Sequence, residues 1–262
     1  MQNINLITWL KIKFKVTYFL IGLNLFMFLM TFLLSGLQSF SYIILGAQVL
    51  PGTAYPFSVY IFEFWRFITS AFLHGGVMHL LLNMYALYSI GMIIEEYWGG
   101  KKLLIIYIFT SITSSLLSFI MAFVGFWQNN SISDGLSISV GASGAIFGLV
   151  GIMLGYKFLK KKTYAPEIDF DVRGLIFFIA FNLLFGFGVN FLSMNVYINN
   201  WAHLGGLIGG VILGAILNTK NTFSQGKFSK IFENILFWIS LLLFVGSFIL
   251  TIISAFLLFF NQ

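Results

Sequence analysis

The chain has 262 residues, of which 59% are hydrophobic and only 8% are charged. Soluble domains carry about 25% charged residues, so a water-soluble fold is excluded for most of this chain. The sequence contains no cysteine, which excludes disulfides, thiolate metal sites and a cysteine nucleophile. The composition predicts an all-α polytopic membrane protein, whose net charge of +6 sets its topology and does not indicate nucleic-acid binding.

Seven apolar stretches come close to the roughly 20 residues that a helix needs to cross a bilayer. In chain order they are Val16–Leu34, Val77–Ile94, Leu103–Val124, Val140–Tyr156, Leu175–Leu192, Trp201–Leu217 and Ile235–Phe259. The fourth and sixth are short and rich in glycine, which is typical of membrane helices that approach closely. No small-residue cleavage pattern clearly follows the first stretch, so we expect it to be a retained helix.

The basic residues predict the orientation of these spans. Of the 14 lysines and arginines, all except Arg66 fall on one side of the seven-span arrangement. By the positive-inside rule, the N-terminus is predicted to be cytoplasmic and the C-terminus to be outside. The outer segment Ser35–Gly76 is long, apolar and aromatic. We expect it to lie partly in the membrane interface as short amphipathic helices.

The spans divide the chain into four parts. We expect a cytoplasmic N-terminal segment at 1–15, a six-span core at 16–217, a cytoplasmic linker at 218–234, and a seventh span with the outer C-terminus at 235–262. The linker includes the polar run Phe223–Phe232. This run makes the seventh helix look like an addition to a core of six.

Polar groups deep in the spans are few, and each requires a reason. His79 and Asn83 lie four residues apart, on one face of the second span. Ser143 opens the fourth span and His203 opens the sixth. Because the second, fourth and sixth spans all run inward from the outer face, these four side chains are expected at one depth, in the outer third of the bilayer.

Glycine rows predict that the fourth and sixth spans pack closely together. The rows are Gly144, Gly148, Gly151 and Gly155 in the fourth, and Gly206, Gly210 and Gly214 in the sixth. Small residues at this spacing let two helix backbones approach. Such an approach would allow a direct hydrogen bond between Ser143 and His203, which nucleophilic catalysis requires.

These residue types predict acyl-transfer chemistry. A serine hydroxyl needs a base to take its proton, and His203 is the candidate. No carboxylate lies inside a predicted span, which favours a dyad over a triad, and Asp134 in a polar outer loop is a weak third member. The backbone amide of Ser143 and the side chains of His79 and Asn83 are candidate donors to the oxyanion.

The sequence resembles the rhomboid family of intramembrane serine proteases over about residues 16–217. Five motifs carry the resemblance, in the order and spans that the family requires. They are Glu63-Phe64-Trp65-Arg66, His74-Gly75-Gly76, His79-Leu80-Leu81-Leu82-Asn83, Gly141-Ala142-Ser143-Gly144, and Ala202-His203 with Gly205-Gly206. The extra C-terminal helix is similar to a seven-span arrangement in this family.

The resemblance implies a role for each matching position. Ser143 would be the nucleophile, His203 the base, and His79 and Asn83 the oxyanion side chains. Phe147 would be the aromatic residue on which the base stacks. The positions expected to support the site are Gly141, Gly144, Gly206, Trp65, Arg66 and His74, of which Trp65-Arg66 and His74 would hold the outer loop without taking part in chemistry.

The resemblance also implies what the protein acts on and where. Members of the family cleave other membrane proteins in or near their transmembrane segments, without a cofactor or metal. The expected partners are therefore transmembrane substrates and the lipid bilayer. The expected location is the plasma membrane of a bacterium.

Two other interpretations remain open. A polar bundle with three histidines is compatible with a small transporter, although no intramembrane carboxylate or inverted repeat supports this. A catalytically inactive rhomboid-like protein that binds transmembrane helices is also compatible. Only a protease should lose its activity on Ser143→Ala, since a binder or transporter should tolerate that change.

Overall fold

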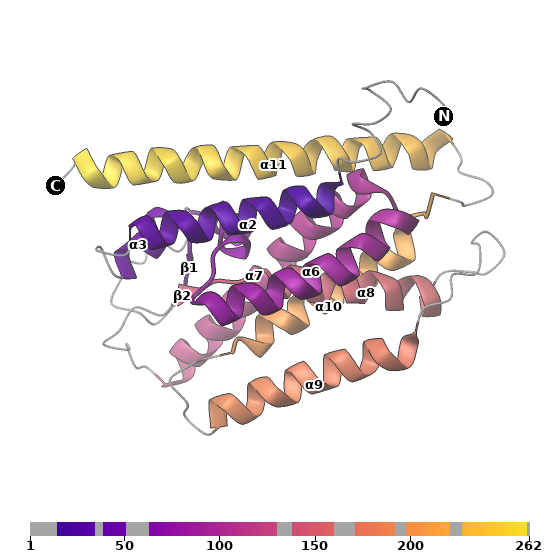
Figure 1. The fold of residues 1–262 in the computed structure, drawn as a ribbon, viewed down its shortest axis with the longest axis horizontal. Coiled ribbons are helices and arrows are strands. Elements are labelled where there is room, and N and C mark those ends of the chain that lie inside the picture. Colours follow the sequence, from indigo (N-terminus) through magenta and orange to yellow (C-terminus); the bar gives the residue numbers. More distant parts are fainter. Residues whose placement is uncertain are drawn as a thin grey trace, which may run out of the picture.

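The computed structural model describes residues 15–34, 39–50, 63–129, 138–159, 171–191, 198–220 and 227–260, and the predicted N-terminal segment lies almost wholly outside them. Its longer helices follow the predicted spans in order, which confirms the all-α fold class (Figure 1). They are α2 (Val16–Leu33), α6 (Val77–Tyr97), α7 (Gly100–Asn129), α8 (Ser143–Leu159), α9 (Val172–Phe191), α10 (Asn200–Ile216) and α11 (Lys227–Phe260).

The lengths of these helices separate two groups. By length and composition, four helices among the described residues are long and apolar enough to cross a membrane: α2, α6, α7 and α11. Helices α8 and α10, of 17 residues each, are shorter, and so is the stretch Val172–Gly188 of α9, over which the structure describes every side chain. The count of seven spans therefore stays a prediction, while several apolar helices are established.

The bundle has a buried centre and exposed flanks. Helices α7, α8 and α10 pack against one another, and nearly every residue of α8 is buried. Helices α11 and α2 run along one side of this centre and α9 along the other (Figure 1). Large apolar side chains of the flanking helices, such as Phe32, Leu184 and Leu242, remain exposed. Such a surface is stable in lipid and not in water.

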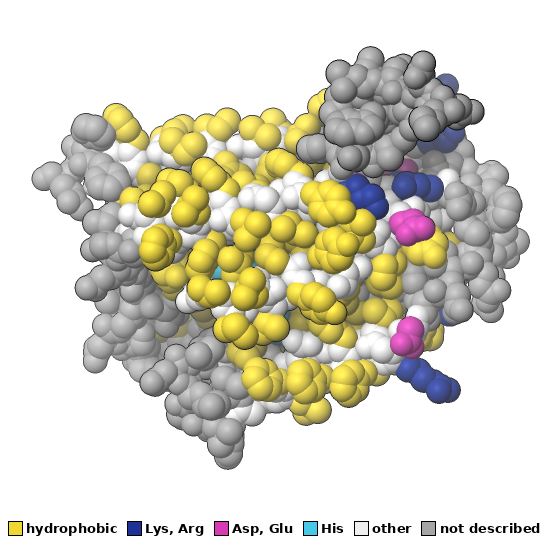
Figure 2. All heavy atoms as spheres, in the orientation of Figure 1, with side chains coloured by type: hydrophobic (Ala, Val, Ile, Leu, Met, Phe, Trp, Pro, Cys, Tyr) yellow, Lys and Arg dark blue, Asp and Glu magenta, His cyan; other side chains and the backbone are white. Residues whose placement is uncertain are grey.

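The charges of the described residues are segregated. Figure 2 shows one face of the molecule covered by hydrophobic side chains, with the charged side chains visible in this view gathered at one end. The first residues of α2 and α11 also lie at this end (Figure 1). This arrangement agrees with the positive side predicted from the lysines and arginines.

Helix α6 continues past its predicted end at Ile94 as far as Tyr97. This extension contains the carboxylate of Glu95, which has a structural role. The Glu95 side chain accepts hydrogen bonds from the backbone N–H groups of Val16 and Thr17, at 2.8 and 2.9 Å. It also accepts one from the Thr17 hydroxyl at 2.7 Å. The first N–H groups of a helix lack partners within it, so Glu95 caps α2.

The outer segment forms short helices, as expected. They are α3 (Ser39–Ile44), α5 (Arg66–Thr69) and the 3-10 helix η2 (Ser70–Phe72). All residues of α5 and η2 are buried in the protein, so the expected amphipathic character is wrong for these two, while the position of the segment in the membrane interface stays a prediction. Residues 51–62 lie outside the described part of the chain.

A two-stranded pairing connects the outer segment to the chain that precedes Ser143, and it was not predicted. Strand β1 (Gln48–Val49) pairs antiparallel with β2 (Ile138–Ser139). Gln48 lies opposite Ser139, and Val49 lies opposite Ile138. The pairing holds the chain just before Ser143 against the outer loop.

Helix α11 begins at Lys227, so the second half of the predicted linker is helical. An ion pair between Lys102 and Glu233, with nitrogen and oxygen 2.9 Å apart, joins α7 to this first part of α11. The Asn218 amide also donates to the Ser229 hydroxyl at 2.8 Å. These contacts bind the seventh helix to the core, which explains why the helix starts before its apolar stretch.

Candidate active site

Ser143 and His203 lie within hydrogen-bond distance, as the sequence predicted. The Oγ atom of Ser143 is 2.9 Å from Nε2 of His203. Ser143 is the first residue of α8, and His203 lies in the first turn of α10. The pair has the separation that a nucleophile and its general base require.

The other ring nitrogen of His203 has no orienting carboxylate among the described residues. Its Nδ1 atom is buried and has no hydrogen-bond partner there. This arrangement fits the predicted dyad, in which no third side chain holds the base. Asp134, the weak candidate for a third member, lies outside the described residues.

An aromatic contact orients the His203 ring instead. The ring of Phe147 lies parallel to it, with centroids 4.4 Å apart and 3° between the planes. Phe147 follows Ser143 by one helical turn, so both contact the same imidazole. Phe147 is itself buried and packs on Phe178 of α9, with centroids 5.6 Å apart. The structure thus places Phe147 where the resemblance expects it.

Glycines bring α8 and α10 into backbone contact, which confirms the predicted close approach. A Cβ atom on Gly206 would collide with the carbonyl of Gly144, and one on Gly210 with the carbonyl of Gly148. The same holds along the pair for Gly151, Gly155 and Gly214. Any larger residue would separate the helices, and with them Ser143 from His203.

The turn before the serine requires glycine at position 141. Gly141 has a φ of 134°, a conformation that side chains rarely adopt. Its N–H donates to the Ser70 carbonyl at 3.0 Å. A Cβ atom here would meet the His79 ring at 2.9 Å and Ser143 Oγ at 3.7 Å. Gly141 therefore makes room for His79 beside the nucleophile.

His79 reaches the serine turn from α6. Its Nδ1 accepts a long hydrogen bond from the N–H of Gly75, at 3.4 Å. In neutral histidine, a nitrogen that accepts leaves the proton on the other nitrogen. Nε2–H of His79 would then point toward Gly141 and the region in front of Ser143. That is the position of a donor to an oxyanion.

The Asn83 side chain was expected to donate to the oxyanion, but it makes a hydrogen bond within its own helix. Its side-chain nitrogen donates to the carbonyl of His79 in the same helix, at 2.9 Å. No hydrogen bond joins Asn83 to Ser143 among the described residues. The Asn83 nitrogen carries a second hydrogen, so a role in the oxyanion site requires either that donor or a change of rotamer.

His74 packs behind His79 and away from the nucleophile. Its side chain is fully buried, and neither ring nitrogen has a hydrogen-bond partner among the described residues. The two histidine rings meet edge to face, with centroids 5.0 Å apart. Burial lowers the pKa of His74 to about 3. A neutral, packed ring fits the structural role that the resemblance implied.

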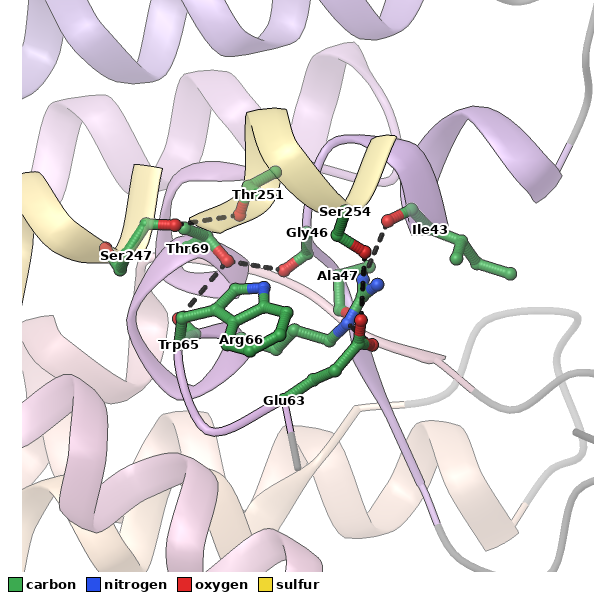
Figure 3. Close-up of polar contacts among 10 residues, drawn as sticks. All are labelled: Ile43, Gly46, Ala47, Glu63, Trp65, Arg66, Thr69, Ser247, Thr251 and Ser254. Atoms are coloured by element: carbon green, nitrogen blue, oxygen red, sulfur yellow. Dashed lines mark hydrogen bonds and ion pairs between the residues drawn. The ribbon is translucent and has the colours of Figure 1, made fainter. Parts of the chain in front are cut away.

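Trp65 and Arg66 lie in the outer loop, away from Ser143. The Arg66 side chain is 4% exposed and forms an ion pair with Glu63. Its Nη1 donates to the carbonyls of Ile43 and Ala47, at 2.7 and 3.1 Å (Figure 3). Arg66 therefore fastens two parts of the loop, as expected of a structural motif.

Sequence reasoning missed Asn199. Its side chain accepts from the N–H of Ala202 at 3.1 Å and so caps α10, the helix of His203. Its amide also donates to Ser118 of α7 at 2.6 Å and to Ser139 of β2 at 3.2 Å. Asparagine immediately before an apolar helix is a known N-cap signal and would have indicated the first contact. Nothing local in the sequence indicates the other two.

The sequence is similar to a known protein family and to several curated proteins. The family model described as the Rhomboid domain matches residues 62–220. The chain is 36% identical over 204 residues to RHOMBOID-like protein 4 of Arabidopsis thaliana, covering 74% of this chain and 47% of that one. It is 35% identical over 165 residues to Rhomboid protease GluP of Bacillus subtilis, covering 63% and 28%. Rhomboid-like protease 3 of Toxoplasma gondii is 31% identical over 172 residues, covering 66% and 59%.

The family model thus covers more than half of the chain, and the matched part includes the paired Ser143 and His203 of the helical bundle. The protein belongs to the rhomboid family and is an integral multi-pass membrane protein. The chain spans about a quarter to three fifths of the length of these curated relatives. The relatives named as proteases support membership in a family of serine proteases.

Proposed function

We propose that the protein is an intramembrane serine endopeptidase that hydrolyses peptide bonds in or near transmembrane segments of other membrane proteins. One observation carries the proposal: Ser143 Oγ lies 2.9 Å from His203 Nε2, where α8 and α10 begin within a bundle of apolar helices. Membership of the rhomboid family gives this pair its expected chemistry.

In the proposed acylation step, His203 takes the proton of the Ser143 hydroxyl as the oxygen attacks the substrate carbonyl. A tetrahedral intermediate forms, and its oxyanion requires preorganised donors. The backbone N–H of Ser143 is free for this role, because the first N–H groups of a helix have no partner within it. His79 is placed to supply a second donor, and Asn83 a third if its free hydrogen turns toward the site.

The intermediate then collapses as His203 gives its proton to the leaving nitrogen, and an acyl-enzyme on Ser143 remains. A water molecule, activated by His203, attacks the ester and regenerates the serine. The substrate helix must unwind locally before this sequence, since helical amides are bonded internally. The distribution of lysine and arginine supports a cytoplasmic N-terminus, with the catalytic pair near the outer face.

Cleavage of a model transmembrane substrate by purified protein in liposomes tests the proposal. Wild type should cut, while Ser143→Ala and His203→Ala should show no cleavage above background. Ser89→Ala is a matched control, because the one bond of the Ser89 hydroxyl within the described part of the chain is to the carbonyl of Tyr85 in its own helix. A Ser143→Ala variant that cuts at the wild-type rate would refute Ser143 as the nucleophile, and a wild type that cuts no substrate would favour a non-peptidase function.

A further inference from the structure

Helix α11 carries a line of polar residues on the face that contacts the core. Ser240, Ser247 and Thr251 are all buried, although most of the helix is apolar and exposed. Ser247 and Thr251 donate to carbonyls of their own helix. Ser254 continues the same line but differs from them, because it has a partner in a distant part of the chain.

The partner of Ser254 is Glu63, in the outer loop. The serine hydroxyl donates to Oε1 of Glu63 at 2.9 Å (Figure 3). The other carboxylate oxygen, Oε2, accepts from Nε of Arg66 at 2.5 Å. Hydrogen bonds to a carboxylate are stronger than those between neutral groups. The hydrogen bond from Ser254 therefore restricts the position of the Glu63 carboxylate, which is the ion-pair partner of the buried Arg66 guanidinium.

Arg66 connects the restrained Glu63 carboxylate to the turn that precedes β1. Its Nη1 holds the carbonyls of Ile43 and Ala47, and the Thr69 hydroxyl holds that of Gly46 at 2.7 Å. Gly46 has a φ of 91°, and a Cβ atom there would meet Thr251 Oγ1 of α11 at 2.9 Å. The seventh helix thus contacts this turn directly and also holds it through Glu63 and Arg66.

The turn leads into the strand pair that precedes the nucleophile. Ala47 is followed by β1, and β1 is bonded to β2 in the register Gln48 to Ser139. After β2 the chain reaches Gly141, whose N–H is bonded to Ser70, and then Ser143. Hydrogen bonds, joined by short stretches of backbone at Ala47–Gln48 and Ser139–Gly141, therefore connect α11 to the serine turn.

We propose that Ser254 and Glu63 are positioning residues, through which the seventh helix fixes the geometry of the Ser143 turn. Neither residue contacts Ser143 or His203, so neither is catalytic. This role deepens the proposed peptidase function. It rests on that function only where it predicts a change in the reaction rate of Ser143. The restraint itself is a property of the fold and can be measured without any substrate.

The test uses Ser254→Ala, with Ser254→Thr as the conservative variant that keeps the hydroxyl. Ser240→Ala is the matched control, because it removes a buried serine from the same face of α11, far from the loop. Glu63→Gln is a second variant that weakens the same link. Amide hydrogen exchange of residues 46–49 and 138–142 is compared in the purified full-length proteins, together with the rate of Ser143 labelling by a fluorophosphonate probe.

Ser254→Ala should speed exchange in both segments by roughly tenfold, the factor expected for loss of one hydrogen bond of ordinary strength. Glu63→Gln should act in the same direction, and Ser143 labelling should slow in parallel. Ser254→Thr and Ser240→Ala should behave as wild type. Unchanged exchange of 138–142 in both Ser254→Ala and Glu63→Gln would overturn the inference. So would an equal change with Ser240→Ala, since that indicates general loosening of α11.

Failure of the proposed function would look different. Wild type would then neither cleave a substrate nor react with the probe, while Ser254→Ala still raised exchange at 138–142. That outcome supports the restraint by α11 and removes the peptidase assignment.

Discussion

The rings of Phe147 and His203 lie parallel, with centroids 4.4 Å apart. Because Nδ1 of His203 has no hydrogen-bond partner among the described residues, this contact takes the place of an orienting carboxylate. Aromatic contacts of this kind contribute about 0.5–1.5 kcal/mol.

Removal of that buried ring should lower both the stability and the cleavage rate, since a cavity is left beside the base. Phe147→Ala is expected to reduce kcat by roughly tenfold, as the base samples unproductive orientations. Phe147→Tyr keeps the ring and should retain most of the activity. Steady-state kinetics of both variants, with thermal unfolding as a check, measure this. Equal kcat in Phe147→Ala and wild type would show that the stacked ring does not orient the base.

Gly206 should not tolerate alanine, because its Cβ atom would collide with the carbonyl of Gly144. Overpacking of this kind destabilises by about 1–3 kcal/mol. We expect Gly206→Ala to lower the unfolding temperature and to abolish cleavage, since the separation of α8 and α10 moves His203 away from Ser143.

Gly246→Ala provides the control for this change. Apart from the backbone of its own helix and its chain neighbours, no atom of the described residues lies within 4 Å of a Cβ atom built on Gly246, which is also in a helix. Alanine favours a helix over glycine by about 1 kcal/mol, so this variant should be as stable as wild type or more so. If the two variants unfold at the same temperature, close contact between α8 and α10 is not what requires glycine.

Asn199 should matter for both stability and rate. Asn199→Ala removes the cap of α10, at a cost of about 1 kcal/mol, and also the bonds to Ser118 and Ser139. Asn199→Ser keeps an N-cap acceptor but is too short to replace every contact. We expect cleavage to fall in the order wild type, Asn199→Ser, Asn199→Ala. Full activity of the alanine variant would show that the cap does not position His203.

His74 predicts a dependence of stability on pH. Burial lowers its pKa to about 3, whereas an unfolded histidine titrates near 6.5. The folded state therefore binds fewer protons than the unfolded state between these values. The stabilisation from this group is complete above pH 6.5 and is lost as the pH falls toward 3.

His74→Phe removes this titration and keeps an aromatic ring in the buried site. Thermal unfolding at pH 7.5 and pH 5 should show a smaller acid-induced drop in Tm for the variant than for wild type. His203 is present in both proteins, so its titration does not account for a difference, whereas the charge of the neighbouring His79 contributes to the effect of His74 and is part of what is measured. An identical drop would show that His74 is not the source.

The sequence predicted the contact between Ser143 and His203 because polar groups are rare in apolar spans. Ser143 and His203 each begin a helix that runs inward, and the glycine rows indicated that these helices touch. This reasoning needs only helical periodicity and the high cost of an unpaired polar group in lipid. The positions of Phe147 and His74 came from the family resemblance.

Contacts between distant residues were not predictable in the same way. A serine at position 254 in an apolar helix does not indicate that its partner is Glu63, because that contact depends on how α11 packs. Glu95 looked like the end of a span, yet it caps α2 and so allows α6 to continue. The orientation of the Asn83 side chain depends on its rotamer, and helical periodicity does not determine the rotamer.

Reaction of the purified protein with a fluorophosphonate, with the modified residue identified by mass spectrometry, tests directly whether Ser143 is the nucleophile. We expect one adduct on Ser143 in wild type and none at that position in His203→Ala, because the serine is activated only by its base. Cleavage of a substrate with no adduct on Ser143, or equal labelling of Ser143 in both proteins, would contradict this role.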